Sequence, residues 1–358
     1  MIFGKKLNVA FVGVKRKPSD FNESYWENFI RFHLELPYYF AKYSNCKIDV
    51  TTVEKINYKR VFSCGSSVRC ITEYEYLNPE FDATHEPYDV VVHWRKWFDE
   101  FYMPSAMNVI LSQDHSYSEQ WKLNVKCAVD SKKLFGILVF PEWHKKNTLN
   151  ELEGIVDESM LFDGLTFGVD TDIYYPDSDY RLKYDLLWAS DPGRGLENLV
   201  EQFLLLWKKD RRYRLTVTYP DYVTKDSVYK FSQFFKHPGV RHIPNLRNCP
   251  DLWNLFNRSM FLPYTSNFKE PSSRCYRQAQ AAGMIVMYPE NMGTPSDIIK
   301  NNVDGIIVQH DKICDKILEI NSDDKIVESI STNASNFAKT QNWEVQANKF
   351  YNFFVSKL

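Results

Sequence analysis

The amino-acid sequence predicts an α/β protein made of two doubly wound domains, each built on a mainly parallel sheet. Three observations support this prediction. The chain has 358 residues, and chains longer than roughly 250 residues tend to divide into domains. Short apolar runs alternate with stretches of helical periodicity, as in successive β-α-β units. A polar segment, 168–183, contains Pro176 and several aspartates and separates two such series.

The first series of elements lies within residues 1–168. A helix is expected at 24–43, and strands are expected at 7–14, 47–53, 88–94, 108–112, 134–140 and 160–167. The run YDVVVHW at 88–94 is almost entirely apolar, which is typical of a strand that is buried on both faces of a parallel sheet. The pattern therefore predicts a complete α/β domain in this half of the chain.

The second series lies within residues 184–341, and a final helix is expected at 342–358. Strands are expected at 184–189, 213–219, 240–243, 260–264, 284–287 and 304–308, and helices at 195–208, 225–236, 251–257 and 270–282. Two α/β domains in one chain are expected to bind a ligand in the cleft between them, outside the carboxyl ends of their strands.

Composition excludes several classes of protein. The chain is 44% hydrophobic and 25% charged, with a formal net charge of −2, so neither a disordered chain nor a protein that neutralises nucleic-acid phosphates is indicated. The seven cysteines show no CxxC spacing that would predict a zinc site or a disulfide framework. No apolar run approaches the ~20 residues of a membrane span. We expect a cytoplasmic protein that makes at most peripheral membrane contact.

The segment 260–308 is the most informative for function. A strand ends at Tyr264, and the sequence Glu270-Pro271-Ser272-Ser273 then begins the helix expected at 270–282. Proline suits the first helical position because its missing N–H would have no partner there. The backbone N–H groups of Ser272 and Ser273 would then form an anion site, helped by the helix dipole. The alternative interpretation is an ordinary capped helix.

This segment resembles the retaining, family-four glycosyltransferases of the GT-B fold. Their donor domains carry a Glu, seven residues and a second Glu, followed by A-x-x-x-G and a strand. The chain reads EPSSRCYRQAQAAG at this place, so Glu270 matches the first Glu and Gln278 replaces the second. The resemblance implies that Glu270 contacts the donor sugar, with Tyr264 beside it, and that Gln278 holds the ribose hydroxyls. An amide still donates and accepts hydrogen bonds, although it lacks the charge.

A second resemblance lies in LLWASDPGRGLENLVEQF, at 186–203. Family members place a small polar residue after the strand and a Lys-Gly or Arg-Gly-Leu sequence where the helix begins. Ser190 and Arg194 fit this pattern, and both are assigned to the donor diphosphate. A guanidinium binds two phosphate oxygens together and stabilises the charge that develops on the leaving group. The alternative for Arg194 is a solvated loop charge.

The segment from Gly168 to Pro176 is similar to the family's linker between domains. Its Asp170-Thr171-Asp172 imitates a metal-binding DxD motif, and we interpret it as a linker turn, because the resemblance implies that no metal is needed. The domain boundaries that follow are 1–168, a linker at 169–183, 184–341 and a helix at 342–358 that crosses back to the first domain.

Candidate residues in the first half follow the ends of its strands. Gly13 stands where the family places a glycine loop under the donor diphosphate. Asp114 and His115 resemble a His-Asp segment beside the donor sugar, where they could take or hold a proton; a capping Asp beside an interfacial His is the alternative. The acceptor-side candidates are three consecutive residues: His93, Trp94 and Arg95.

These features predict a GT-B protein, with two Rossmann-like doubly wound domains facing a cleft. We expect an enzyme that moves a hexose or pentose from a nucleotide diphosphate sugar, its co-substrate, to a hydroxyl of a glycan or lipid-linked acceptor. Retention of anomeric configuration is expected, with Arg194, Glu270, Asp114 and His115 as the catalytic candidates and with no cofactor. The alternative is a non-catalytic protein that binds a nucleotide sugar or glycan and assists a partner enzyme.

Overall fold

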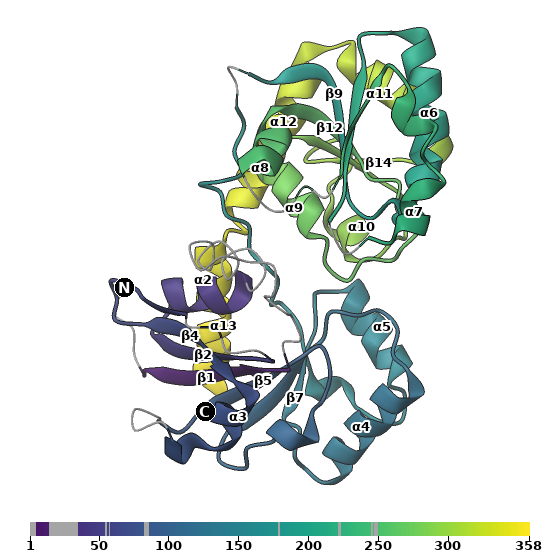
Figure 1. Cartoon of the computed structure of the whole chain (residues 1–358). Helices are drawn as coiled ribbons and strands as arrows, with labels where there is room; N and C mark the ends of the chain where they lie inside the picture. The colour runs from purple at the N-terminus through teal and green to yellow at the C-terminus, as the bar shows by residue number, and fades with distance from the viewer. Residues whose placement is uncertain are drawn as a thin grey trace. The chain divides into compact units, whose positions relative to one another are not determined.

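The structure is a computed structural model, and it describes most of the chain. The described residues are 5–13, 35–53, 56, 58–81, 86–177, 180–220, 223–244, 246 and 250–358. The first part of the helix expected at 24–43, up to residue 34, lies outside them. The chain divides into two compact units (Figure 1). Unit 1 contains Met1–Gly168 and Trp343–Leu358, and unit 2 contains Val169–Asn342.

Unit 1 is built on a mainly parallel sheet with the strand order β3-β4-β2-β1-β5-β6-β7-β8 among the described residues. The strands are β1 Leu7–Val12, β2 Cys46–Thr52, β3 Lys59–Val61, β4 Ser67–Thr72, β5 Val90–Trp94, β6 Met107–Leu111, β7 Gly136–Leu138 and β8 Leu161–Phe162. β3 pairs with β4 in the antiparallel direction, and the other pairs are parallel. β1, β5 and β6 are nearly all apolar and buried, as a sheet covered on both faces requires.

Helices cover both faces of the unit 1 sheet. They are α2 Glu35–Tyr43, α3 Glu73–Leu77, α4 Glu119–Asp130, α5 Trp143–Glu151 and, from the end of the chain, α13 Trp343–Lys357. α2 and α13 pack together in one core with the inward side chains of β1 and β2. α4 packs against the other side chains of β6 and β7 in a second core. The sequence pattern predicted this doubly wound arrangement, and the structure confirms it.

Unit 2 has a fully parallel sheet in the order β11-β10-β9-β12-β13-β14. Its strands are β9 Leu182–Ala189, β10 Arg214–Thr218, β11 Val240–Ile243, β12 Ser259–Pro263, β13 Ile285–Tyr288 and β14 Ile306–Ile307. Counted from β9, this is the order 3-2-1-4-5-6 of the dinucleotide-binding fold. The chain reverses direction across the sheet between β9 and β12, and such a switch point leaves room for a ligand at the carboxyl ends of the two strands.

The helices of unit 2 lie on both sides of its sheet (Figure 1). They are α6 Leu196–Lys209, α7 Lys225–Tyr229, α8 Pro250–Arg258, α9 Arg274–Ala281, α10 Thr294–Ile298, α11 Ile313–Asn321 and α12 Asp324–Lys339. α6 and α11 cover one face, and α9 and α12 pack together on the other. α6 buries Leu196, Leu199, Phe203 and Leu206, an i, i+3, i+7 stripe that is typical of a helix lying on a sheet.

The last helix, α13, belongs to unit 1, as the sequence predicted. Trp343 is 2% exposed, and its ring stacks on Tyr39 of α2 at 5.0 Å between centroids. A Cβ atom at Gly168 would lie 2.5 Å from the Trp343 Cα, so a side chain at Gly168 would push this contact apart. Phe350 and Phe354 continue the same apolar face into the unit 1 core.

Three expectations about local structure were wrong. The helix expected at 270–282 begins at Arg274, because Ser273 is its N-cap and the backbone of Glu270 pairs with Gly293 instead. The segment 225–236 breaks after α7 into a 3₁₀ turn, Phe234–Lys236. Phe231 and Phe234 are both buried, and their spacing of three suits the three-residue period of a 3₁₀ turn. The strand expected at 160–167 is only Leu161–Phe162. The antiparallel pair of β3 and β4 was not predicted at all.

Candidate functional site

The carboxyl ends of β9 and β12, the two strands at the switch point of unit 2, bring four predicted site residues together. Ser190 directly follows β9, and Arg194 ends a short 3₁₀ turn after it. Tyr264 directly follows β12, and Glu270 lies in the loop that leads to α9. These residues are up to 80 positions apart in the chain, and the parallel order of the strands explains why they meet.

The loop that carries Arg194 is held by hydrogen bonds at both ends. The Asp191 carboxylate accepts a bond from the Gly193 N–H at 2.8 Å, and the Arg194 carbonyl accepts one from the Asn267 N–H at 3.0 Å. Gly195 has a φ of +115°, and a Cβ atom there would lie 2.1 Å from the Thr265 carbonyl oxygen. Glycine is therefore required where this turn enters α6, since no other residue combines that φ with that contact.

Glu270 is the centre of a buried polar network. Its side chain is 7% exposed and forms an ion pair with Arg194, which is 33% exposed. The same carboxylate oxygen, Oε1, accepts a hydrogen bond from the Tyr264 hydroxyl at 2.9 Å, and that hydroxyl lies 3.3 Å from the Ser190 Oγ. Removing a carboxylate from water costs free energy unless the group is ion-paired and hydrogen-bonded. This network supplies both kinds of partner.

Three stacked aromatic rings pack on the buried side of the network. Trp188, Tyr264 and Tyr288 stack in series, with centroids 5.7 Å and 5.4 Å apart, and each is 2% exposed or less. Burial, reinforced by the charge of Glu270, raises the pKa of the Tyr264 hydroxyl well above its ordinary value, so this group stays protonated and donates to Glu270. On the solvent side, the Arg194 guanidinium lies 4.6 Å from the ring centre of Phe268.

The anion site predicted at Ser272 and Ser273 requires correction. Both residues precede α9, and the Ser273 hydroxyl caps the helix by accepting a bond from the Tyr276 N–H at 3.3 Å. The first-turn N–H groups of this helix therefore belong to Arg274 and Cys275. The Ser272 hydroxyl is buried and has no hydrogen-bond partner among the described residues. Gln278 lies half-buried in the second turn of α9.

Gly13 occupies the corresponding position in unit 1, directly after β1. Its φ is +75°, and a Cβ atom would lie 2.1 Å from the Phe98 ring. Its N–H donates to the Thr51 hydroxyl at 3.1 Å. The glycine is thus explained by a tight turn against an aromatic ring, and its N–H already has a partner.

Arg95 and Asp114 form a two-point ion pair at the carboxyl ends of β5 and β6. The Arg95 Nε donates to Asp114 Oδ2 at 3.1 Å, and Nη2 donates to Oδ1. Arg95 is 54% exposed and has a φ of +69°, which is uncommon for a residue with a side chain and often marks a functional position. Trp94 and His115 are half-buried beside this pair.

The prediction that His93 contacts the acceptor is wrong, because its side chain does not reach the surface. His93 is 0% exposed, stacks on Trp97 at 4.3 Å and lies 3.3 Å from the Asn108 Oδ1. Burial lowers the pKa of its imidazole to about 4. The residue is a neutral core histidine, and the sequence pattern could not separate this case from a ligand contact.

A second buried histidine, His144, was missed by the sequence analysis. Its Nδ1 accepts a bond from the Phe140 N–H at 3.1 Å, and its Nε2 donates to the Asp114 carbonyl at 2.8 Å. Burial lowers the pKa of this imidazole to about 4 as well. His144 therefore fixes the loop that carries Asp114 and His115. Its place shortly after the strand expected at 134–140 was the available signal.

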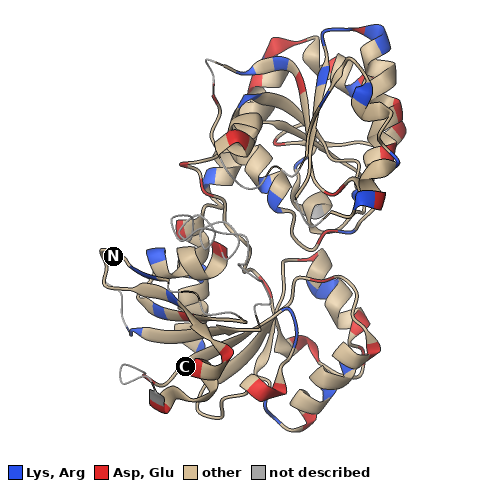
Figure 2. Cartoon of the chain, in the orientation of Figure 1, with Lys and Arg blue, Asp and Glu red and all other residues tan. Residues whose placement is uncertain are grey.

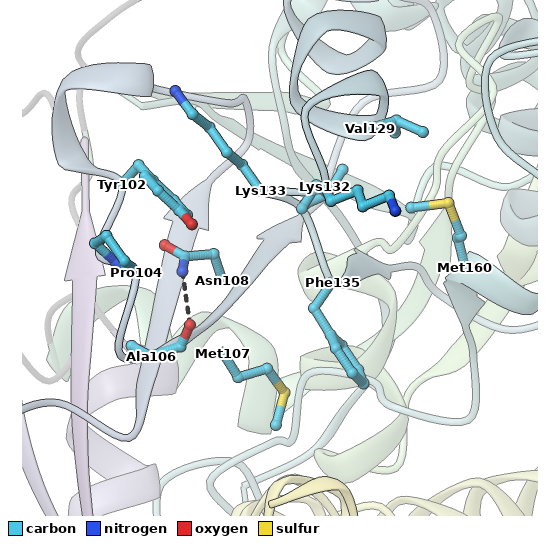
Figure 3. A pocket seen from close by; sticks show the side chains of 11 residues that line it. Tyr102, Pro104, Ala106, Met107, Asn108, Val129, Lys132, Lys133, Phe135 and Met160 are labelled. Carbon is cyan, nitrogen blue, oxygen red and sulfur yellow. Dashed lines mark hydrogen bonds between the residues drawn. The ribbon is translucent and has the colours of Figure 1, made fainter.

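A cavity of about 420 Å³ lies in unit 1, away from these residues (Figure 3). Met107, Phe135 and Met160 line it at the amino ends of β6, β7 and β8, together with Lys132 and Lys133. Ligands of doubly wound sheets bind at the opposite, carboxyl ends, and none of the predicted site residues lines this cavity.

The described ranges contain neither a metal-binding cluster nor a membrane-spanning helix. No cluster of three or more His, Cys, Asp or Glu side chains is placed to hold a metal ion. No helix is both long and apolar enough to cross a membrane.

Two doubly wound units in one chain, with the last helix packed on the first unit, define the GT-B fold of glycosyltransferases, and this chain has that fold. Two solved structures align with 98% of it. One is HepE from Anabaena, solved in complex with UDP and glucose; it is 13% identical, the alignment covers all of that chain, and the TM-score is 0.69. The other is sucrose-phosphate synthase from Thermosynechococcus elongatus; it is 12% identical, the alignment covers 99% of that chain, and the TM-score is 0.71. A glycosyltransferase from Rickettsia africae aligns equally well (15%, 98% of each chain, 0.69). The sequence matches no family model and no curated protein.

Proposed function

We propose that this protein is a glycosyltransferase that binds a nucleotide diphosphate sugar at the carboxyl edge of unit 2. The observation that carries the proposal is the ion pair between the half-buried Arg194 and the buried Glu270 at the switch point of a GT-B unit. A cation and an anion held side by side match the two parts of such a donor, which are an anionic diphosphate and a neutral, hydroxyl-rich sugar. HepE, which shares the fold, was solved with UDP-glucose.

Each residue of the network has a distinct role in this proposal. Arg194 binds the diphosphate and stabilises the charge that the leaving group gains as the glycosidic bond breaks. Glu270 accepts hydrogen bonds from sugar hydroxyls, and Tyr264 and Ser190 keep its carboxylate in place. The N–H groups of Arg274 and Cys275 at the start of α9 face the same anion, in place of those first assigned to Ser272 and Ser273. Gln278 holds the ribose hydroxyls.

The acceptor is a hydroxyl of a glycan or a lipid-linked sugar. With His93 buried, Trp94 and Arg95 of unit 1 are the acceptor-side candidates, and Asp114 and His115 are assigned beside the donor sugar. The acceptor oxygen bonds to the anomeric carbon while the bond from that carbon to the phosphate oxygen breaks. The electron pair of the broken bond goes to the diphosphate, which also takes the proton of the acceptor hydroxyl. Retention of configuration follows when attack and departure share one face. We assign no metal and no cofactor to this step.

The direct test is turnover with a panel of nucleotide sugars, measured as release of the nucleotide diphosphate in the presence and absence of an acceptor panel. We expect release with one class of donor, and loss of release in the Glu270→Gln variant. That variant keeps the size of the side chain and removes its charge. Release that proceeds equally in the Glu270→Gln protein would exclude this network as the donor site.

The alternative is a non-catalytic protein that binds a nucleotide sugar for a partner enzyme. Gln278 favours it, because the amide lacks the charge that the resembling family uses at this position. Isothermal titration separates the two functions. Tight binding of a nucleotide diphosphate without turnover of any donor, across the full acceptor panel, would support the non-catalytic protein and contradict the enzyme.

A further inference from the structure

The outward face of α6 combines apolar and basic side chains in an unusual order. Leu204 and Leu205 are 39% and 49% exposed, and Lys208 and Lys209 follow one turn later, also exposed. Positions i, i+1, i+4 and i+5 of a helix lie on neighbouring parts of one face. The buried face of α6 uses other residues, so the two leucines are not needed for the unit 2 core.

The basic character continues beyond the helix. Arg211 and Arg212 follow α6 directly and are exposed. We call the six residues Leu204, Leu205, Lys208, Lys209, Arg211 and Arg212 the α6 patch. In Figure 2 the end of α6 and the loop after it are blue, at the upper right of unit 2.

Acidic neighbours neutralise part of this charge. Asp315 pairs with Lys209 at 2.7 Å, and Asp210 pairs with Arg212 at 2.7 Å. Within the described residues, no carboxylate forms an ion pair with Lys208 or Arg211, so the four basic residues outnumber their two acidic partners. The Lys209–Asp315 salt bridge is exposed at both ends and is therefore weak. Arg212 is held more firmly, because its Nε and Nη2 donate to both carboxylate oxygens of Asp210.

The neighbouring sheet edge is also basic. Arg214 at the start of β10 lies in register with Asp185 of β9, and the charges of Arg214, Arg258 and Arg241 all act on that one carboxylate. Each of the three arginines is exposed. These residues mark the amino edge of the unit 2 sheet, the opposite end from Arg194 and Glu270, so the donor site does not account for them.

Two simpler explanations are incomplete. Lysines in the last turn of a helix are favoured by the helix dipole, which accounts for Lys208 and Lys209 but not for the arginines beyond the helix or for two exposed leucines. An extended polyanion such as nucleic acid would need no apolar contact, so it does not account for the two exposed leucines. Leucines beside lysines and arginines are the composition of a helix that lies in a membrane interface.

We propose that the α6 patch docks unit 2 on an anionic lipid surface. The basic residues are attracted by the negative surface potential of anionic headgroups, and Leu204 and Leu205 enter the boundary between headgroups and acyl chains. α6 then lies flat on the membrane, and the carboxyl edge of unit 2 stays in water. This proposal is independent of the proposed catalysis, because its readout is vesicle binding.

The test is sedimentation of the full chain with vesicles of phosphatidylcholine alone or with 30% phosphatidylglycerol, a composition chosen as about one-third anionic. We expect binding to the anionic vesicles that weakens at least tenfold in 0.5 M NaCl. Lys208→Glu/Lys209→Glu and Leu204→Ser/Leu205→Ser should each weaken binding at least tenfold. Lys339→Glu/Lys349→Glu and Leu123→Ser, which alter exposed residues elsewhere, are the matched controls and should bind like the unchanged chain.

Three outcomes would overturn the proposal. The first is no sedimentation with anionic vesicles at low salt. The second is binding that survives Leu204→Ser/Leu205→Ser but is lost with Lys208→Glu/Lys209→Glu, and that free polyanions abolish by competition, which would indicate a polyanion site. The third is equal weakening by the control substitutions. Circular dichroism and thermal melting of each variant confirm that unit 2 is folded in the protein tested.

Discussion

The two units share one architecture but differ in the polar groups that they bury at the carboxyl ends of their strands. In unit 1, His93 and His144 are buried, neutral and satisfied by neighbouring side-chain and backbone groups. In unit 2, the buried Glu270 and the half-buried Arg194 form an ion pair at the same end of the sheet, whereas the Arg95–Asp114 ion pair of unit 1 is more exposed. Each arrangement satisfies its polar groups, and the two differ in what a ligand would find there.

This difference separates structural chemistry from binding chemistry. A neutral histidine whose ring nitrogens are bonded to backbone groups stabilises loops, and it has neither a charge nor a free nitrogen with which to bind a charged ligand. An ion pair in a partly exposed site holds its two charges in fixed positions. A charged group of a ligand can then replace one member of the pair. Unit 1 therefore combines two structural histidines with an exposed Arg95–Asp114 pair, whereas unit 2 holds a less exposed ion pair at its switch point.

The largest effect is expected from Arg194→Ala. Removing the guanidinium should lower kcat/KM by about 100- to 1,000-fold, because one preformed donor to developing charge is worth that much, and it should weaken nucleotide diphosphate binding. Arg95→Ala is the matched change in unit 1 and should leave the dissociation constant for the nucleotide unchanged. Isothermal titration with UDP and other diphosphates measures both. Equal weakening by the two variants would contradict the division of chemistry between the units.

Acid should destabilise unit 1 more than unit 2. Burial holds the pKa of His93 and His144 at about 4, below the ordinary 6.5, so the unfolded chain binds more protons between these values. Stability is then greatest above pH 6.5 and falls as the pH drops toward 4. At pH 5.5 the loss is about 1.4 kcal/mol for each histidine.

Urea unfolding at pH 7.5 and 5.5, followed by pulse proteolysis, would report each unit separately. The half-buried His242 and His310 of unit 2, whose pKa values are also lowered by burial, should give a smaller loss. A pH-independent unfolding midpoint for unit 1 would show that its histidines do not resist protonation.

A smaller effect is expected from Tyr264→Phe. The ring stays in its stack, but Glu270 loses the hydroxyl that fixes its carboxylate, at a cost of about 1–2 kcal/mol for the unmade bond. We expect kcat to fall about tenfold and the melting temperature to fall by a few degrees. Tyr288→Phe removes a hydroxyl from the same stack, which bonds the Met292 carbonyl at 3.3 Å, and serves as the control. Identical kinetics for the two variants would mean that Tyr264 acts through packing alone.

The smallest effect is expected from Gln278→Glu. If the side chain holds ribose hydroxyls, a carboxylate accepts those bonds at least as well, so donor affinity should stay within about threefold or improve. The KM for the donor and direct titration of the diphosphate both measure it. A tenfold loss of affinity would place Gln278 beside a phosphate or another anion instead of a diol.

The sequence predicted the fold well because doubly wound sheets leave strong patterns. Nearly every strand in unit 2 was expected within two residues, since buried parallel strands are continuous apolar runs. The end of the sheet at which Ser190, Arg194 and Glu270 meet also follows from strand order. The resemblance to a known family chose these three residues from many polar loop residues.

The errors arose where three-dimensional context decides. Ser273 is the N-cap of α9, and the preceding Glu270 pairs with Gly293, a contact across 23 positions of the sequence that no local pattern encodes. His93 looked like a ligand contact because it ends a strand, yet its side chain turns toward Trp97. The Arg194–Glu270 pair joins loops 76 residues apart, so each charge was predicted without the other.

The placement of α13 has a consequence for how the chain folds during synthesis. Unit 2 is an uninterrupted segment, Val169–Asn342, whereas unit 1 needs residues from both sides of it. Domains tend to fold as they leave the ribosome, so unit 2 can complete its core first. Part of the apolar surface of unit 1 stays exposed to water until Trp343, Phe350 and Phe354 have been synthesised and can pack into its core. Unit 1, although most of it precedes unit 2 in the chain, is therefore expected to complete its core last.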